Sequence, residues 1–393
     1  MTTLVRPSCL TPLAWLATLR PKSTCSLLAA ALLAAGCAGS EPATRPAEGE
    51  PRADFEMYGY HVWWMQEAWR EVPLGRLAEG GVFFFDLRAD TAGVADAHGW
   101  PTRWDDLRRA AGAAGTPVYP TVSVQGAERF ERVFASGEAA RAVRADALAA
   151  MRTAEAGGLH LDVEAYGNVS RTARQGFTRF VRRLREDLPA GAHLSLFAPA
   201  FDRADALDEA ALVEHVDRLV VQGYDLHARG SDTAGPVAPL AGWGGRNWQA
   251  ILARYDRLGV PREKLVFSVP LFGYEWPTRG PEPGARVTEP GRTISYAPGA
   301  SERVPNLDVS ALERVAKHGK RRDDASRSPY YVFQTEGGQW RQGWFEDARS
   351  LRAKYRFARE NGLAGIALFA LGYDGGRLWP ALSEPEGAAG ASR

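Results

Sequence analysis

The sequence predicts an α/β fold, a (β/α)8 TIM barrel with a small α+β insertion between the seventh and eighth strands. Two observations lead to this class. Short β-prone apolar runs alternate with amphipathic stretches rich in Ala, Arg and Leu, which indicates βα units around a parallel sheet. Eight such runs lie between residues 55 and 382, and a chain of 393 residues is long enough for one barrel of this kind.

The predicted elements follow one another in chain order, and two amphipathic stretches, 137–156 and 172–187, are the clearest helices. In a barrel of this class the active site lies at the carboxyl ends of the strands. The predicted strands are 57–64, 81–86, 117–124, 158–164, 193–199, 218–224, 264–272 and 365–371.

The stretch from about 277 to 342 breaks this rhythm. It is rich in Gly, Pro and Arg, and it holds short β-prone pieces at 293–296 and 330–335. We therefore expect a small α+β insertion here. It either forms a wall of a binding groove or is a loop without a role in function.

The segment 157–166 is the most informative part of the chain. Successive side chains of a strand point to opposite faces, so His160, Asp162 and Glu164 project together while the apolar residues between them face the other way. Two close carboxylates in a cleft do not both ionise easily, and one remains a proton donor near neutral pH. A proton donor beside a second carboxylate is the usual pair of groups for glycoside cleavage, with Glu164 as the acid.

Two other interpretations of this segment stay open at this point. It could be a solvated edge strand with scattered charges. His160, Asp162 and Glu164 could also bind zinc, since imidazole and carboxylate are zinc ligands, although no other cluster with ligand spacing stands out to complete such a site.

The strand 157–164 resembles the DGxDxDxE strand of glycoside hydrolase family 18, the chitinase family. Gly158, Asp162 and Glu164 match, whereas Gly157 and His160 depart from the pattern. Three further segments resemble later strands of the family in the family's order, which makes the resemblance specific. They are 222–227, similar to the MxYD motif with Tyr224 and Asp225 retained and Gln222 in place of Met, then 268–276 and 365–374.

The run 344–354, which leads into the last predicted strand, is typical of the family branch that includes bacterial spore-cortex and other envelope-acting enzymes. The resemblance covers about residues 55–382. It suggests a glycosidase of chitinase or N-acetylglucosaminidase type, whose polymer is peptidoglycan or a chitin-type glycan.

The resemblance implies a retaining mechanism in which the 2-acetamido group of the substrate attacks the anomeric carbon. Glu164 would be the general acid and base, Asp162 would orient the acetamido group, Tyr224 would hydrogen-bond its carbonyl, and Asp225 would hold sugar and water. No metal or organic cofactor is implied. Further candidate substrate-binding residues are His160, Tyr60, Tyr274 and Phe369.

Two departures from the family pattern lead to expectations of their own. We expect His160 to hydrogen-bond Asp162 and, if protonated, to lower the pKa of Asp162. Phe369 stands at the position where members of the family commonly have a Trp at the base of the cleavage subsite. Weaker sugar binding is therefore expected. Alternatively, His160 is a core histidine and Phe369 a packing residue. A second function class also remains open, a glycan-binding protein on the same barrel.

The N-terminal region resembles an export signal. Arg20 and Lys22 precede a short apolar stretch that ends at Cys37, and residues 33–37 resemble a bacterial lipoprotein processing site. We expect a signal peptide at 1–37, lipidation of Cys37, a flexible tether at 38–54 and a disordered tail at 383–393. Ordinary signal cleavage nearby is the alternative. The expected location is a membrane-anchored lipoprotein facing the periplasm or cell wall.

The overall charge excludes one class of partner. Lys and Arg number 48 against 47 Asp and Glu, which gives no support for nucleic-acid binding. The 12 Trp and 12 Tyr side chains offer faces that stack on sugar rings, although most of them are expected in the core. The expected partners are a glycan and a membrane, and no obligate protein partner is evident.

Overall fold

The computed structural model describes residues 55–202, 204–299, 307 and 309–382. The predicted signal peptide, Cys37, the tether at 38–54 and the tail at 383–393 lie outside the described residues.

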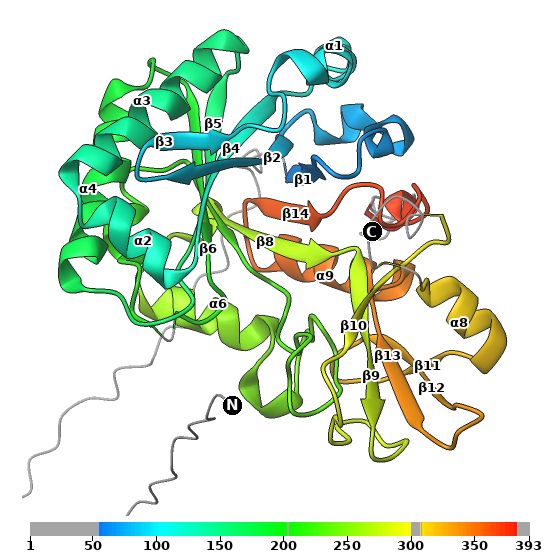
Figure 1. Cartoon of the computed structure of the whole chain (residues 1–393). Helices are drawn as coiled ribbons and strands as arrows, with labels where there is room; N and C mark the ends of the chain where they lie inside the picture. The colour runs from blue at the N-terminus through cyan, green and yellow to red at the C-terminus, as the bar shows by residue number, and fades with distance from the viewer. Residues whose placement is uncertain (1–54, 203, 300–306, 308, 383–393) are drawn as a thin grey trace, which may run out of the picture. The chain divides into compact units, whose positions relative to one another are not determined.

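A closed parallel barrel forms the centre of the described part (Figure 1). β1 pairs in parallel with both β2 and β14, and this pairing closes the sheet. The predicted TIM barrel is confirmed. One addition was not predicted, the short strand β3 (Gly93–Asp96), which pairs antiparallel with the end of β2. The parallel strands are β1 (Glu56–Val62), β2 (Gly81–Asp90), β4 (Val118–Gln125), β5 (Gly158–Glu164), β6 (His193–Ala198), β7 (Arg218–Val221), β8 (Leu265–Pro270) and β14 (Gly365–Phe369).

The barrel strands are buried on both faces, as their apolar runs require. The register of the sheet sets polar side chains next to one another inside it. His160 of β5 lies opposite Thr121 of β4 and Ser195 of β6, and Asp162 lies opposite Ser123. Polar residues of β5 therefore occupy successive layers of the barrel interior, ending at its carboxyl edge.

Helices cover the outside of the barrel, and α2, α3 and α4 lie together on one side in Figure 1. Ser136, Ser170 and Asn247 cap the N-termini of α3, α4 and α6 by accepting a backbone hydrogen bond. The helices around the barrel are α1 (Asp105–Ala113), α2 (Ala127–Phe134), α3 (Gly137–Thr153), α4 (Arg171–Asp187), α5 (Glu209–Leu212), α6 (Trp248–Arg257) and α9 (Ala348–Glu360). The short 3-10 helices are η1 (Ala68–Glu71), η2 (Leu74–Leu77), η3 (Thr102–Trp104), η4 (Trp243–Gly245), η5 (Arg262–Lys264) and η6 (Trp379–Leu382).

The insertion is an antiparallel sheet in the order β10-β9-β13-β12-β11, flanked by α8 (Ala311–His318). It begins earlier than the predicted 277, because β9 follows β8 after the single residue Leu271. The buried carboxylate of Glu275 ties its parts together by accepting hydrogen bonds from Tyr331 at 2.8 Å and from Arg314 at 2.9 Å. The strands are β9 (Phe272–Thr278), β10 (Arg292–Ser295), β11 (Arg321–Arg322), β12 (Pro329–Gln334) and β13 (Trp340–Trp344).

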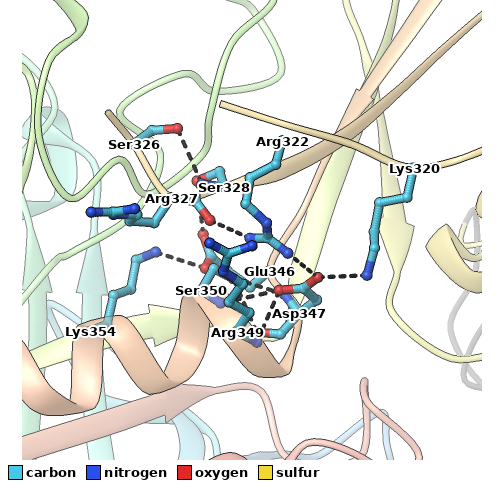
Figure 2. Close-up of polar contacts among 10 residues, drawn as sticks. All are labelled: Lys320, Arg322, Ser326, Arg327, Ser328, Glu346, Asp347, Arg349, Ser350 and Lys354. Atoms are coloured by element: carbon cyan, nitrogen blue, oxygen red, sulfur yellow. Dashed lines mark hydrogen bonds and ion pairs between the residues drawn. The ribbon is translucent and has the colours of Figure 1, made fainter. Parts of the chain in front are cut away.

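Figure 2 shows what the run 344–354 does in the fold. Asp347 caps α9 through its Oδ1 atom, while its Oδ2 atom binds Lys320 at 3.0 Å and Arg322 at 2.5 Å. The ammonium group of Lys354 lies 2.7 Å from Glu346, and both side chains are buried. These contacts join the insertion to the helix before the last barrel strand, so the run is a structural junction.

Candidate active site

A cavity of about 410 Å³ opens at the carboxyl ends of the barrel strands. The structure brings seven of the eight predicted site residues together in its wall: Asp162, Glu164, Tyr224, Asp225, Tyr60, Tyr274 and Phe369. The insertion contributes Phe272, Tyr274 and Thr293 to the same wall, as expected for a groove-forming insertion. His160 does not line the cavity.

Asp162 and Glu164 form a hydrogen-bonded pair of carboxyl groups on one face of β5. Burial raises the pKa of Asp162 to about 7, and a hydrogen bond from Gln125 at 3.3 Å opposes this rise. Burial and the neighbouring Asp162 raise the pKa of Glu164 well above its usual range. Glu164 therefore keeps its proton when Asp162 ionises, which is the state that a general acid needs.

Tyr224 and Asp225 follow the end of β7 and line the same cavity as the carboxyl pair. Asp225 has a φ of 59°, a left-handed conformation that Asp tolerates better than most residues. Its Oδ1 atom accepts a hydrogen bond from the hydroxyl of Tyr274 at 2.9 Å. Burial raises the pKa of Asp225 to about 6, and this hydrogen bond limits the rise.

Phe369, the last residue of β14, lies among aromatic rings at the cavity wall. Its ring centroid is 5.4 Å from that of Tyr60 and 5.8 Å from that of Tyr224. Phe85 and Phe272 complete the group at 6.1 and 6.2 Å. Phe369 is therefore both a packing residue and part of an apolar surface that a sugar ring could contact.

The predicted hydrogen bond between His160 and Asp162 is wrong. His160 Nε2 lies 2.9 Å from the hydroxyl of Tyr60, and Nδ1 lies 2.8 Å from Ser195 Oγ. The parallel register places Ser195 directly beside His160, and the hydroxyl of Tyr60 on β1 takes the second ring nitrogen, so neither nitrogen is left for Asp162. Burial also lowers the pKa of His160 well below its usual range, so the neutral ring does not act on Asp162 as a cation.

Several residues of the cavity wall were not predicted. Among them are Asp86 within β2, Gln125 at the end of β4, and Trp64, whose indole donates to Tyr373 at 3.1 Å. One signal could have found Trp64, Asp86 and Gln125, because each closes or follows a predicted strand at the edge where barrel active sites form. Tyr373 lies two residues beyond the last predicted strand, within the segment 365–374 that resembles the family.

Comparison with protein families now decides the identity of this barrel. Residues 80–374 match the model of "Glycosyl hydrolases family 18", which is most of the chain. The chain belongs to this family. The resemblance inferred from the four strand motifs is confirmed, and the family is one of glycosidases.

Relatives of this family 18 chain include a protein that is named for the lysis of cortical fragments. The "Cortical fragment-lytic enzyme" of Bacillus anthracis is 25% identical over 246 residues, which are 60% of this chain and 51% of the relative. This chain therefore spans about half the length of that curated relative.

Solved structures of the family share the fold. The Bacillus cereus spore cortex-lytic enzyme SleL superposes with a TM-score of 0.65 at 20% identity, over 84% of this chain and 73% of that one. A family 18 N-acetylglucosaminidase from Paenibacillus barengoltzii superposes with a TM-score of 0.68 at 18% identity, over 84% of this chain and 99% of that one.

Two kinds of feature are absent from the described ranges. No set of three or more His, Cys, Asp and Glu side chains there is arranged to hold a metal ion. The helices of that part are all too short or too polar to cross a membrane.

Proposed function

We propose that this family 18 chain is a retaining glycosidase that cleaves β-1,4 bonds of N-acetylglucosamine-containing glycans by substrate-assisted catalysis. Glu164 protonates the glycosidic oxygen while the acetamido oxygen of the substrate attacks the anomeric carbon, and it later activates water. Asp162 orients the acetamido nitrogen and stabilises the oxazolinium charge. Tyr224 donates a hydrogen bond to the acetamido carbonyl, and Asp225 holds sugar and water.

The observation that carries this proposal is the carboxyl pair on β5. Asp162 and Glu164 share a hydrogen bond, which raises the pKa of Glu164 and lowers that of Asp162. Burial raises the pKa of Tyr224 far above neutrality, so its hydroxyl remains a donor at any working pH. An acid, an ionisable partner and a neutral donor in one cavity fit the three tasks of the mechanism.

A second cavity supports the assignment of Glu164 as the acid. This hollow of about 190 Å³ shares Glu164, Tyr166, Phe197 and Gln222 with the first cavity. Glu164 therefore stands between two spaces, where the acid that protonates a bridging oxygen has to stand. The sugar with the attacking acetamido group would occupy the cavity of Asp162, and the leaving group would occupy the second hollow.

Peptidoglycan is the polymer that the relatives favour. The Bacillus anthracis relative is named a cortical fragment-lytic enzyme, and the Bacillus cereus structure is that of a spore cortex-lytic enzyme. We propose further that the protein is exported and anchored through a lipid on Cys37, which keeps the barrel close to the polymer. Fractionation of cells that make the wild-type protein or Cys37→Ala tests the anchor, since the variant should leave the membrane fraction.

Release of reducing ends from peptidoglycan and from chitin oligosaccharides tests the activity. The wild-type protein should release them and Glu164→Gln should not, with a loss of at least roughly 10²-fold for removal of a general acid. The preferred polymer separates a wall hydrolase from a chitinase. Glycan binding without cleavage by both proteins would instead support a glycan-binding protein.

A further inference from the structure

Asp86 is a carboxylate in the cavity wall that the proposed mechanism does not use. It lines the same cavity as Asp162 and Glu164 but lies on a different strand, β2. Its residue is only 7% exposed, so it does not serve as an ordinary solvated surface charge. Burying a carboxylate is costly unless a partner compensates it.

The partner of Asp86 is His98, which follows β3. His98 Nε2 lies 3.1 Å from Asp86 Oδ1, and the other ring nitrogen faces Asp96 at 3.4 Å. The imidazole stacks on the indole of Trp63, with centroids 4.1 Å apart and planes 12° apart. A hydrogen bond and a stacked ring fix the carboxyl of Asp86, so its position in the wall is defined before any ligand binds.

We propose that Asp86, held in place by His98, is a further substrate-positioning residue that presents a fixed carboxylate to the sugar bound over Asp162. This inference deepens the proposed function and rests on it. A carboxylate at the cavity wall accepts hydrogen bonds from sugar hydroxyl groups, and such charge-assisted bonds are among the stronger ones. Sugars whose hydroxyl at that position is blocked would lose this contact.

Asp86 also acts electrostatically on Asp162. The titratable and charged groups around Asp86 are His98, Asp96 on β3, Arg88 on β2 and Asp162 on β5. The negative charge of Asp86 raises the pKa of Asp162, in addition to the larger effect of burial. Removal of this charge therefore lowers the pKa of Asp162, and the acid limb of kcat/KM should move to lower pH. A residue with a purely structural role would not move this limb.

The test compares matched variants for kinetics between pH 4 and 9. Asp86→Asn should raise KM and lower kcat/KM by about tenfold, the value of one hydrogen bond to a charged group. It should also move the acid limb to lower pH. Asp106→Asn is the control, since Asp106 is exposed on α1 and lies outside the cavity.

Two substitutions test the role of His98. His98→Phe keeps a flat ring on Trp63 and removes the donor, so KM should rise. His98→Gln keeps a donor and should recover much of the loss. Melting curves of all variants identify any that fail to fold. Kinetics of Asp86→Asn within twofold of Asp106→Asn, with an unmoved acid limb, would overturn the proposal.

A binding measurement separates this proposal from the proposed function. Calorimetry with triacetylchitotriose compares Glu164→Gln with Glu164→Gln/Asp86→Asn, and neither protein needs to turn over substrate. About tenfold weaker binding by the double variant supports the role of Asp86, even if the wild-type protein cleaves nothing. Equal affinities, or no binding by either protein, would overturn it.

Discussion

His160 Nε2 lies 2.9 Å from the hydroxyl of Tyr60, and only Tyr60 of the two lines the cavity. The imidazole stacks on Phe83 with centroids 4.0 Å apart, and its second nitrogen is bound to Ser195. His160 therefore reaches the site through the orientation of Tyr60. It holds Tyr60 in the cavity wall and does not exchange protons with the carboxyl pair.

Replacement of His160 by Asn should reduce stability more than it changes the pH dependence. The smaller side chain loses the contact with Phe83 and one of two buried hydrogen bonds, and we expect a loss of about 2 kcal/mol in the free energy of unfolding. The limbs of the pH–rate profile should stay in place, because His160 is already neutral. Denaturant unfolding and kcat/KM between pH 4 and 9 check both parts, and a displaced limb would contradict this account.

Tyr274→Phe should move the acid limb in the direction opposite to Asp86→Asn. The Tyr274 hydroxyl donates to Asp225 and lowers its pKa, which is about 6 with this bond in place. Without the donor the pKa of Asp225 rises, so Asp225 ionises only at higher pH and the acid limb shifts upward. The pH dependence of kcat/KM measures this shift. A limb that stays in place would mean that the ionisation of Asp225 is not needed.

Phe369→Ala should weaken substrate binding more than turnover. The ring packs against Tyr60 and Tyr224 and offers an apolar face to the cavity. Loss of such a contact costs about 1 kcal/mol, roughly a fivefold rise in KM. Phe369→Trp is the matched variant, with a larger face and an expected fall in KM. Equal KM values for all three proteins would leave Phe369 as a packing residue only.

His61→Phe should reduce the acid sensitivity of the fold. Both ring nitrogens of His61 are buried and have no hydrogen-bond partner among the described residues, and burial lowers the pKa of His61 to about 3. The unfolded chain takes up the proton near pH 6.5 and the folded protein does not, so stability falls as the pH decreases below about 6.5. The substitution should reduce the decrease of the free energy of unfolding with falling pH, by at most about 1.4 kcal/mol per pH unit.

Thermal or denaturant unfolding of the wild-type protein and His61→Phe between pH 4 and 7.5 measures the difference. The comparison isolates one group, because the raised pKa values of the active-site carboxyls act in both proteins alike. Parallel stability curves would contradict the assignment of a neutral buried His61.

Lys354→Met should destabilise the fold, and a second substitution should repair it. Glu346 and Lys354 are both buried, so removal of the lysine leaves an unpaired carboxylate at a cost of about 3 kcal/mol (Figure 2). Glu346→Leu/Lys354→Met removes both charges and should recover most of this loss. A double variant that unfolds as easily as the single one in denaturant would show that the pair itself is required.

The barrel strands were predictable because a parallel sheet is buried on both faces and leaves continuous apolar runs. The alternation of side chains along one strand correctly predicted that Asp162 and Glu164 lie on the same face. The partners of His160 were not predictable in this way, since they depend on the register between neighbouring strands and on the rotation of a ring. The contact that fixes Asp86 was not predictable for a related reason, because its partner His98 follows an edge strand that local sequence did not indicate.

The boundary of the insertion differed from expectation for a simple reason. β8 and β9 form one almost continuous β-prone run, and only the pairing partners distinguish the barrel from the insertion. Sequence alone carries no information on which neighbour a strand will pair with at such a point.

The single residue between β8 and β9 also constrains protein engineering. Tyr274, which holds Asp225, lies on the first strand of the insertion and not on the barrel. An exchange of insertions between relatives, made to alter which glycans are accepted, would therefore replace part of the reaction centre as well. Grafts that retain Phe272–Thr278 and vary only the remaining strands would separate a change of specificity from a loss of rate.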